Sequence, residues 1–176
     1  MESNVRISVI IPVYNGETFL GRCIRSLIKQ RIDNEFYEII FIDDGSTDHT
    51  QQILENYNDY IKVIRHKKNK GLAISCNEGI KKALGSYIIR VDADDYIDEN
   101  FLTVLSSVLD DKPEIGLVFP DYYHVDSQGD IIETIRREKI THEEELLDLP
   151  AHGACTMYRK EVLQNLGSYF LKLHLW

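Results

Sequence analysis

Two aspartates separated by one residue, Asp92 and Asp94, directly follow the strongly apolar residues 87–91. Carboxylates at this spacing offer hard oxygen ligands, which suit Mg²⁺ or Mn²⁺ ions that keep some waters and share their shell with substrate phosphates. A turn or a helix cap explains the same pair equally well, and it best explains the neighbouring Asp95. The element therefore indicates either a metal site for a phosphorylated ligand or a structural turn.

Three further polar segments could contact other parts of such a ligand. The pair Asp43-Asp44 could accept an N–H group of a base, and the ring of Tyr14 could stack on that base. The segment Asn69-Lys70-Gly71 could offer backbone N–H groups and an ammonium to a phosphate at a helix start. Each segment also has an ordinary structural explanation as a turn, as rim packing or as a solvated loop.

Alternating strand-like and helix-like patterns must position these residues. β-Branched runs predict strands, and apolar residues at helical spacing predict helices with one buried face. Asp48 and Gln51 fit a capping box, and Gly85 fits a helix end. This alternation predicts an α/β fold with a mostly parallel sheet, helices on both faces and ligands beyond the carboxyl ends of the strands. The expected strands are residues 6–13, 37–42, 62–65, 87–91 and 115–119, and the expected helices begin near Thr18, Asp48, Gly71 and Asp98.

Beyond about residue 120 the alternation stops. Residues 121–135 predict a short antiparallel excursion that turns at residues 127–130. Residues 143–149 and 158–166 each predict a short helix.

The composition excludes several classes of protein. The chain has 176 residues, of which 43% are hydrophobic, which suits one domain with a core. Its net charge of −9 argues against nucleic-acid binding and against electrostatic docking on an anionic membrane. No apolar run approaches the ~20 residues of a membrane span, and the first residues do not resemble a signal peptide. Three widely spaced cysteines fit neither a zinc site nor a disulfide framework and predict a reducing, cytoplasmic location.

Five ordered segments resemble those of the family-2 glycosyltransferases of the GT-A fold: SVIIPVYNGE, FIDDGSTD, NKGLAISCNEG, GSYIIRVDADD and HGACTMYRKEVL. The resemblance extends from about residue 6 to residue 169. It implies a Rossmann-like GT-A fold and an inverting sugar transfer from a nucleotide-diphospho-sugar, expected to be a UDP-sugar. The implied acceptor is a glycan or an envelope polysaccharide, and the implied cofactor is Mn²⁺ or Mg²⁺. A lipid-linked acceptor would place this cytoplasmic enzyme at the inner face of the membrane.

The resemblance also assigns residues to the nucleotide. Pro12, Tyr14 and Glu17 match the first nucleotide-contact loop. Asp44 matches the residue that holds the uracil ring, so Asp44→Ala should weaken UDP binding with little loss of fold stability.

The acidic element matches the Asp-X-Asp motif of the family. Asp92 matches its first aspartate, near the ribose, and Asp94 matches its second, which ligates the metal at the diphosphate. Ala93, between them, and Asn69 and Gly71 complete the expected nucleotide-sugar site.

Two departures from the family pattern bear on function. Cys76 stands where the family often has an arginine that faces the nucleotide. After Asp148 the only acid is Glu161, which fits a first-turn helix residue better than a catalytic base. We therefore expect the base beyond Trp176. Residues 1–120 would form the nucleotide-sugar-binding half, and residues 121–176 a partial acceptor-side region of the same domain.

A different class of protein remains as the alternative. A truncated, catalytically silent module that binds nucleotide or a partner chain would show the same donor-site residues. The apolar residues 170–176 would suit self-association, so a homodimer is among the expected partners, beside the nucleotide sugar and the acceptor.

Overall fold

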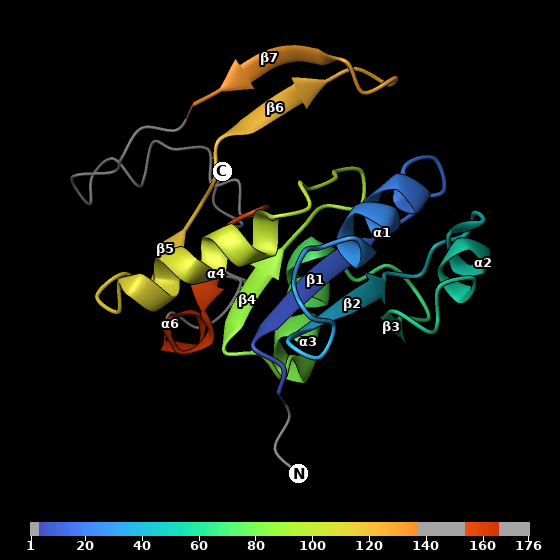
Figure 1. Cartoon of the computed structure of the whole chain (residues 1–176). Helices are drawn as coiled ribbons and strands as arrows, with labels where there is room; N and C mark the ends of the chain where they lie inside the picture. Colours follow the sequence, from blue (N-terminus) through green and yellow to red (C-terminus); the bar gives the residue numbers. More distant parts are fainter. Residues whose placement is uncertain (1–3, 137–153, 166–176) are drawn as a thin grey trace, which may run out of the picture.

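The structure is a computed structural model that describes residues 4–136 and 154–165. Within these residues six strands form one sheet (Figure 1), and the pairs β3–β2, β2–β1 and β1–β4 are parallel. The four strands predicted up to residue 91 are confirmed, as is the mostly parallel sheet. Across the sheet the strands are β3 (Lys62–Arg65), β2 (Tyr37–Asp43), β1 (Ile7–Val13), β4 (Tyr87–Arg90), β8 (Met157–Arg159) and β5 (Leu117–Val118).

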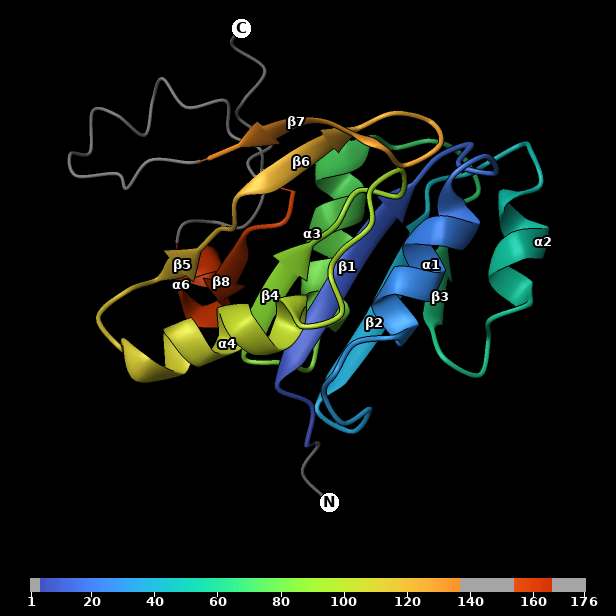
Figure 2. The same ribbon diagram turned by 45° about the horizontal axis from the view of Figure 1, so that its top comes forward.

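Helices cover both faces of the sheet because its central strands are apolar on both faces. Every residue of β1 and β2 is buried. Odd-numbered residues of β1 pack with α1 (Leu20–Ile28), α2 (Thr50–Glu55) and α4 (Phe101–Asp111), while Ile10 packs on the opposite face with α3 (Leu72–Lys82) and α6 (Lys160–Asn165). The two views agree on this three-layer arrangement (Figures 1 and 2). The sheet is therefore a rigid platform whose loops can carry a site.

The end of the described chain returns to the sheet, which the sequence patterns do not predict. Strand β8 lies between β4 and β5 and runs antiparallel to both. The predicted helix over residues 158–166 begins instead at Lys160, after this strand. The predicted strand over residues 115–119 is reduced to Leu117–Val118, because only these two residues pair with β8.

Two predicted helix signals have other roles. Asp48 Oδ1 accepts a 3.0 Å hydrogen bond from the Thr50 amide, but Gln51 donates to Glu55, so no reciprocal capping box forms. Gly85 does not end α3, whose C-cap is Ala83. A Cβ at Gly85 would lie 2.7 Å from the amide nitrogen of Ser8, so this glycine allows the chain to pass close to β1.

The predicted antiparallel excursion is confirmed. Strands β6 (Tyr122–Val125) and β7 (Ile131–Ile135) form a two-stranded sheet. This hairpin lies beyond the carboxyl ends of β1 and β4 (Figure 2). The predicted helix over residues 143–149 lies outside the described residues. In the described part of the chain, we find no helix with the length and apolar character of a membrane span.

Candidate functional site

Three loops meet at one edge of the sheet because β1, β2 and β4 run in the same direction (Figure 1). Val13 lies beside Asp43 in the register, and the Asp44 amide donates a 2.8 Å hydrogen bond to the Val13 carbonyl. The Val91 amide donates to the Ile10 carbonyl at 3.1 Å. The loops that follow, with Tyr14, Asp44 and the 92–95 acidic segment, therefore share the carboxyl edge of the sheet, as predicted for a ligand site in an α/β fold.

The loop after β1 is held by hydrogen bonds to the start of α2. Asn15 adopts a positive φ of 53°, and its amide donates to Ser46 Oγ at 3.0 Å. The Gly16 amide donates to Thr50 Oγ1 at 2.9 Å. These bonds hold the loop while the ring of Tyr14 remains 50% exposed. The ring is thus placed at the edge with an open surface.

Glu17 and Pro12, both predicted nucleotide contacts, also have internal structural roles. Hydrogen bonds from the backbone and then the side chain of His49 lower the pKa of the Glu17 carboxyl, with both contacts at its Oε2. Pro12 is a buried strand residue beside Ile42. The pairing of β1 with β4 ends at Ile10, so the missing N–H of Pro12 leaves no gap on that side. Their contacts with nucleotide stay predictions.

Asp44 is buried, with a side chain 5% exposed. Its Oδ1 lies 2.5 Å from Nδ1 of His66 and accepts a 2.9 Å hydrogen bond from the Lys70 amide. Its Oδ2 accepts a 2.8 Å hydrogen bond from the amide of Gly71, whose φ is 92°. Burial opposes ionisation of Asp44, but the hydrogen bonds outweigh it and lower its pKa.

These contacts change two expectations. The amides of Lys70 and Gly71 donate to Asp44, so in this structure they are not directed to a phosphate. Asp44 is also a buried carboxylate with three partners, so we now expect its replacement by alanine to cost stability, in place of the small loss expected from the sequence. A carboxylate has about four acceptor positions, so one remains for a ligand.

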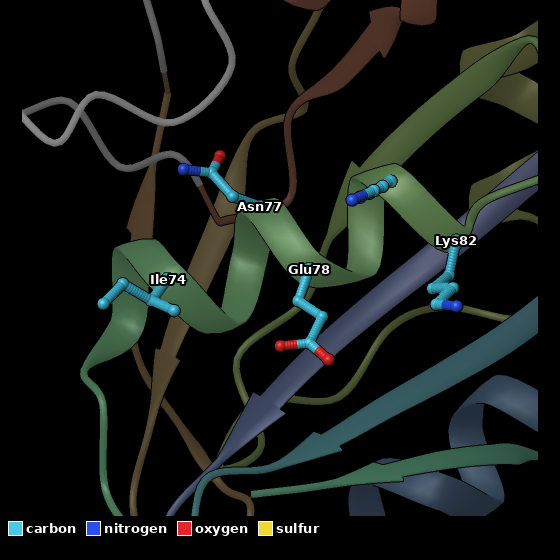
Figure 3. A pocket seen from close by; sticks show the side chains of 5 residues that line it. Ile74, Asn77, Glu78 and Lys82 are labelled. Carbon is cyan, nitrogen blue, oxygen red and sulfur yellow. The ribbon is translucent and has the colours of Figure 1, made fainter.

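Two further residues, His66 and Glu78, lie behind Asp44. The sequence patterns did not predict that they belong to this site. His66 has a side chain 2% exposed, and its Nε2 lies 2.7 Å from Glu78 Oε2. Hydrogen bonding to His66 is the main cause that lowers the pKa of Glu78. Figure 3 shows Glu78 projecting from α3 toward the strands, away from Asn77. No sequence pattern links residues on a loop and a helix in this way.

The same helix borders a hollow of about 530 Å³ on the outer side of the domain. Among the described residues, those that line it all belong to α3: Ile74, Asn77, Glu78, Lys81 and Lys82 (Figure 3). Only Glu78 connects this hollow to the Asp44 network. None of these five lining residues belongs to the three loops.

The acidic segment after β4 carries an arginine among its carboxylates. Arg90 Nε lies 3.0 Å from Asp92 Oδ1, and Nη2 donates a 3.2 Å hydrogen bond to Asp92 Oδ2. Asp94 and Asp95 are exposed. Desolvation, followed by the charges of Asp92 and Asp94, raises the pKa of Asp95 to about 6, even though Asp95 keeps an exposed surface. The described residues contain no group of three or more His, Cys, Asp or Glu side chains placed to hold a metal ion.

Cys76, at the position of the expected arginine, is fully buried in α3. Burial raises the pKa of its thiol to about 11, so it is neutral at physiological pH and no nucleophile. Its thiol interacts with the guanidinium of Arg90.

Ala154 and Cys155 lie at the same edge of the sheet as the three loops. Ala154 forms a bridge with Arg90, and the Cys155 amide donates a 2.6 Å hydrogen bond to the Arg90 carbonyl. Strand β8 then runs back, so Arg159 lies beside Tyr87, at the start of β4. Glu161 follows in the first turn of α6, at the opposite edge from the three loops. Its position does not suit a base at this site.

An α/β sheet with polar and acidic loops at the carboxyl ends of three parallel strands is typical of the domains that bind a ligand at this edge. Within that class, this chain belongs to glycosyl transferase family 2, whose family model matches residues 8–167.

Named relatives agree with this family. The chain is 35% identical over 123 residues to the glycosyltransferase GlyG of Streptococcus pneumoniae, covering 68% of this chain and 40% of GlyG. It is 40% identical over 102 residues to the poly(ribitol-phosphate) beta-glucosyltransferase of Bacillus spizizenii, covering 56% of this chain and 16% of that enzyme. The crystal structure of S. aureus TarS in complex with UDP-GlcNAc matches with a TM-score of 0.80 at 25% identity, covering 94% of this chain and 48% of that chain. This chain thus spans less than half the length of each.

Proposed function

We propose that this chain forms the donor-binding part of an enzyme that transfers a sugar from a UDP-sugar to an envelope-polysaccharide acceptor, with inversion. The observation that carries the proposal is the meeting of the loops after β1, β2 and β4 at one sheet edge in a family 2 domain. The UDP-GlcNAc in the TarS complex supports the donor class. The relative that acts on poly(ribitol-phosphate) supports the acceptor class.

The donor would be bound by residues from each loop. The half-exposed ring of Tyr14 stacks on the base, and the remaining acceptor position of Asp44 takes the ring N–H of uracil. Asp92 accepts from a ribose hydroxyl. Pro12 and Glu17 act by holding the Tyr14 loop against α2 and β2.

The remaining site residues lie on the loop after β3 and on the loop after β4. Gly71 acts by orienting Asp44 through its amide. Asn69 lies on the exposed surface of the same loop, and Ala93 separates the two aspartates of the motif without filling the space between them.

The residues at this edge fit a divalent metal. Asp94 is an exposed carboxylate at the carboxyl end of β4, next to Asp92, whose charge is already paired with Arg90. One free hard ligand is what Mg²⁺ or Mn²⁺ needs from a protein when phosphates and waters supply the rest of its shell. Asp94 would hold the metal, which would offset charge on the nucleoside-diphosphate leaving group.

Further parts of the proposal concern the rest of the protein. We assign residues 1–120 to the donor side and residues 121–176 to the acceptor side of one domain. We place the catalytic base outside the described residues, because Glu161 lies at the opposite edge of the sheet. The free thiols of Cys23, Cys76 and Cys155 suit a cytoplasmic location.

A UDP-release assay with a panel of UDP-sugars and Mn²⁺ tests the reaction on the protein that contains this chain. We expect acceptor-dependent UDP release that Asp94→Asn reduces at least tenfold, since metal-assisted charge stabilisation contributes several kcal/mol. The matched control is Asp111→Asn, which removes an exposed carboxylate at the end of α4 and should leave the rate unchanged. UDP binding without any transfer would instead support a silent nucleotide-binding module. Equal rates for the two variants would contradict the role of Asp94.

A further inference from the structure

Arg90 is a nearly buried cation within the acidic edge of the sheet. Its side chain is only 11% exposed, and its guanidinium contacts both carboxylate oxygens of Asp92. A guanidinium that contacts both oxygens of a carboxylate restricts the rotation of that carboxylate more than a single contact does. The pair therefore presents Asp92 in one orientation.

The backbone of Arg90 is also held from two sides. Arg90 lies beside Ile10 in the pairing of β4 with β1. On its other side, its carbonyl accepts the hydrogen bond from Cys155, and the residue forms a bridge with Ala154. The backbone that carries the guanidinium is therefore held in place by the sheet. The buried, compact side chain of Cys76 lies against the guanidinium.

Charge gives Arg90 a second role. Asp92, Asp94 and Asp95 lie within four residues of the chain, and a diphosphate brings further negative charge to them. Like charges at such distances repel each other strongly where solvent is partly excluded.

We propose that Arg90 is a positioning residue of the nucleotide site: it orients Asp92 toward a hydroxyl of a nucleoside diphosphate and offsets the charge that repels the diphosphate. A carboxylate held by a guanidinium keeps further lone pairs, so Asp92 can still accept from that hydroxyl. The inference rests on the proposed function, since it concerns the same ligand.

The test is calorimetric binding of UDP in the presence of Mn²⁺ to the whole chain and five variants. We expect Arg90→Gln to weaken binding roughly tenfold or more, the usual effect of losing a contact with a charged group. Arg90→Lys keeps the charge with fewer donors and should recover part of that loss. Arg6→Gln is the matched control, because Arg6 also contacts both oxygens of an aspartate, Asp110, and neither residue belongs to the three loops. It should bind UDP as the wild type does.

Asp92→Asn and the double variant with Arg90→Gln separate positioning from general stabilisation. If Arg90 acts through Asp92, the loss of UDP binding in the double variant is clearly smaller than the sum of the two single losses, because coupled residues are not additive; what Arg90→Gln still costs beside Asp92→Asn is its charge effect on the diphosphate. Fully additive losses, or wild-type binding by Arg90→Gln, would overturn the inference. If Arg90→Gln does not fold, wild-type binding by Arg90→Lys at every salt concentration would overturn the orienting role, and weakened binding would support it. A wild-type chain that fails to bind UDP would contradict the proposed function itself.

Discussion

Replacing Asp44 with asparagine should destabilise the fold and weaken nucleotide binding at the same time. The carboxylate is 5% exposed and accepts from His66, Lys70 and Gly71. Asparagine keeps one acceptor oxygen, but its NH₂ group then faces one of these donors. Removing one partner of a buried charged pair costs about 3–5 kcal/mol, and each lost hydrogen bond to a charged group costs about 1.5–3 kcal/mol.

We therefore expect Asp44→Asn to lower the free energy of unfolding by about 3 kcal/mol, allowing for the acceptor that asparagine retains. At about 2–4 °C per kcal/mol for a domain of this size, the melting temperature falls by roughly 6–12 °C. Urea unfolding measures the first quantity, and calorimetry of the folded variant should show UDP binding at least tenfold weaker.

The matched control is Asp126→Asn in the turn of the β6–β7 hairpin. Asp126 Oδ1 also accepts three backbone hydrogen bonds, from Gln128, Gly129 and Asp130, but the residue is exposed. Water can replace those bonds, so the cost should be about 1 kcal/mol or less. An unfolding midpoint for Asp44→Asn equal to that of Asp126→Asn would refute the reasoning, because burial would then make no difference.

Three further predictions follow from other described residues. Burial opposes ionisation of Glu38, but hydrogen bonds, first from Lys62, outweigh it and lower its pKa below 4.5, just as the pKa of Asp44 lies below 3.8. The unfolded chain binds more protons at these two groups, so their stabilising contribution is complete above about pH 5 and is lost as the pH falls below about 4, whereas the raised pKa of Asp95 makes its contribution larger as the pH falls from about 6 toward 4. A urea midpoint that does not fall between about pH 4 and pH 3 would contradict the role of Glu38 and Asp44. Tyr14→Ala should weaken UDP binding by about 1–3 kcal/mol with an unchanged melting temperature, as expected for a half-exposed stacking ring. Cys76 should resist iodoacetamide at pH 7.5 until the protein is unfolded, and peptide mapping would detect labelling of the folded chain.

The parallel part of the sheet could be predicted from the strand patterns in the sequence. The runs that became β1 and β2 are apolar in most residues on both faces, with the buried Ser8 and Glu38 among the exceptions, so the strands could be identified directly. Because ligand loops follow the carboxyl ends of parallel strands, the positions of Tyr14, Asp44 and Asp92 at one edge followed from the same patterns. Strand β8 could not be predicted, since its three residues are strand only because β4 and β5 pair with them.

The partners within the site were less predictable than its position. His66 meets Asp44 and Glu78 through contacts 22 and 12 residues apart in the sequence, which no local period encodes. The pairing of Arg90 with Asp92 is local, but β4 ends at Arg90, and strand alternation does not predict the direction of a side chain in the loop that follows. The prediction that Gly85 ends a helix was wrong for the same reason. This glycine is needed where the chain passes close to β1, and that contact is not encoded in the neighbouring sequence.

The most direct test of the central claim is a calorimetric titration of UDP into the chain with Mn²⁺ and, separately, with EDTA. Asp94 and the exposed carboxylates of this edge should repel a free diphosphate, and a bridging divalent cation should turn that repulsion into attraction. We expect UDP to bind the wild-type chain in Mn²⁺ and at least tenfold more weakly in EDTA, and to bind Asp94→Asn equally weakly in both buffers. Equal affinity of the wild-type chain in both buffers, or no binding in either, would contradict it.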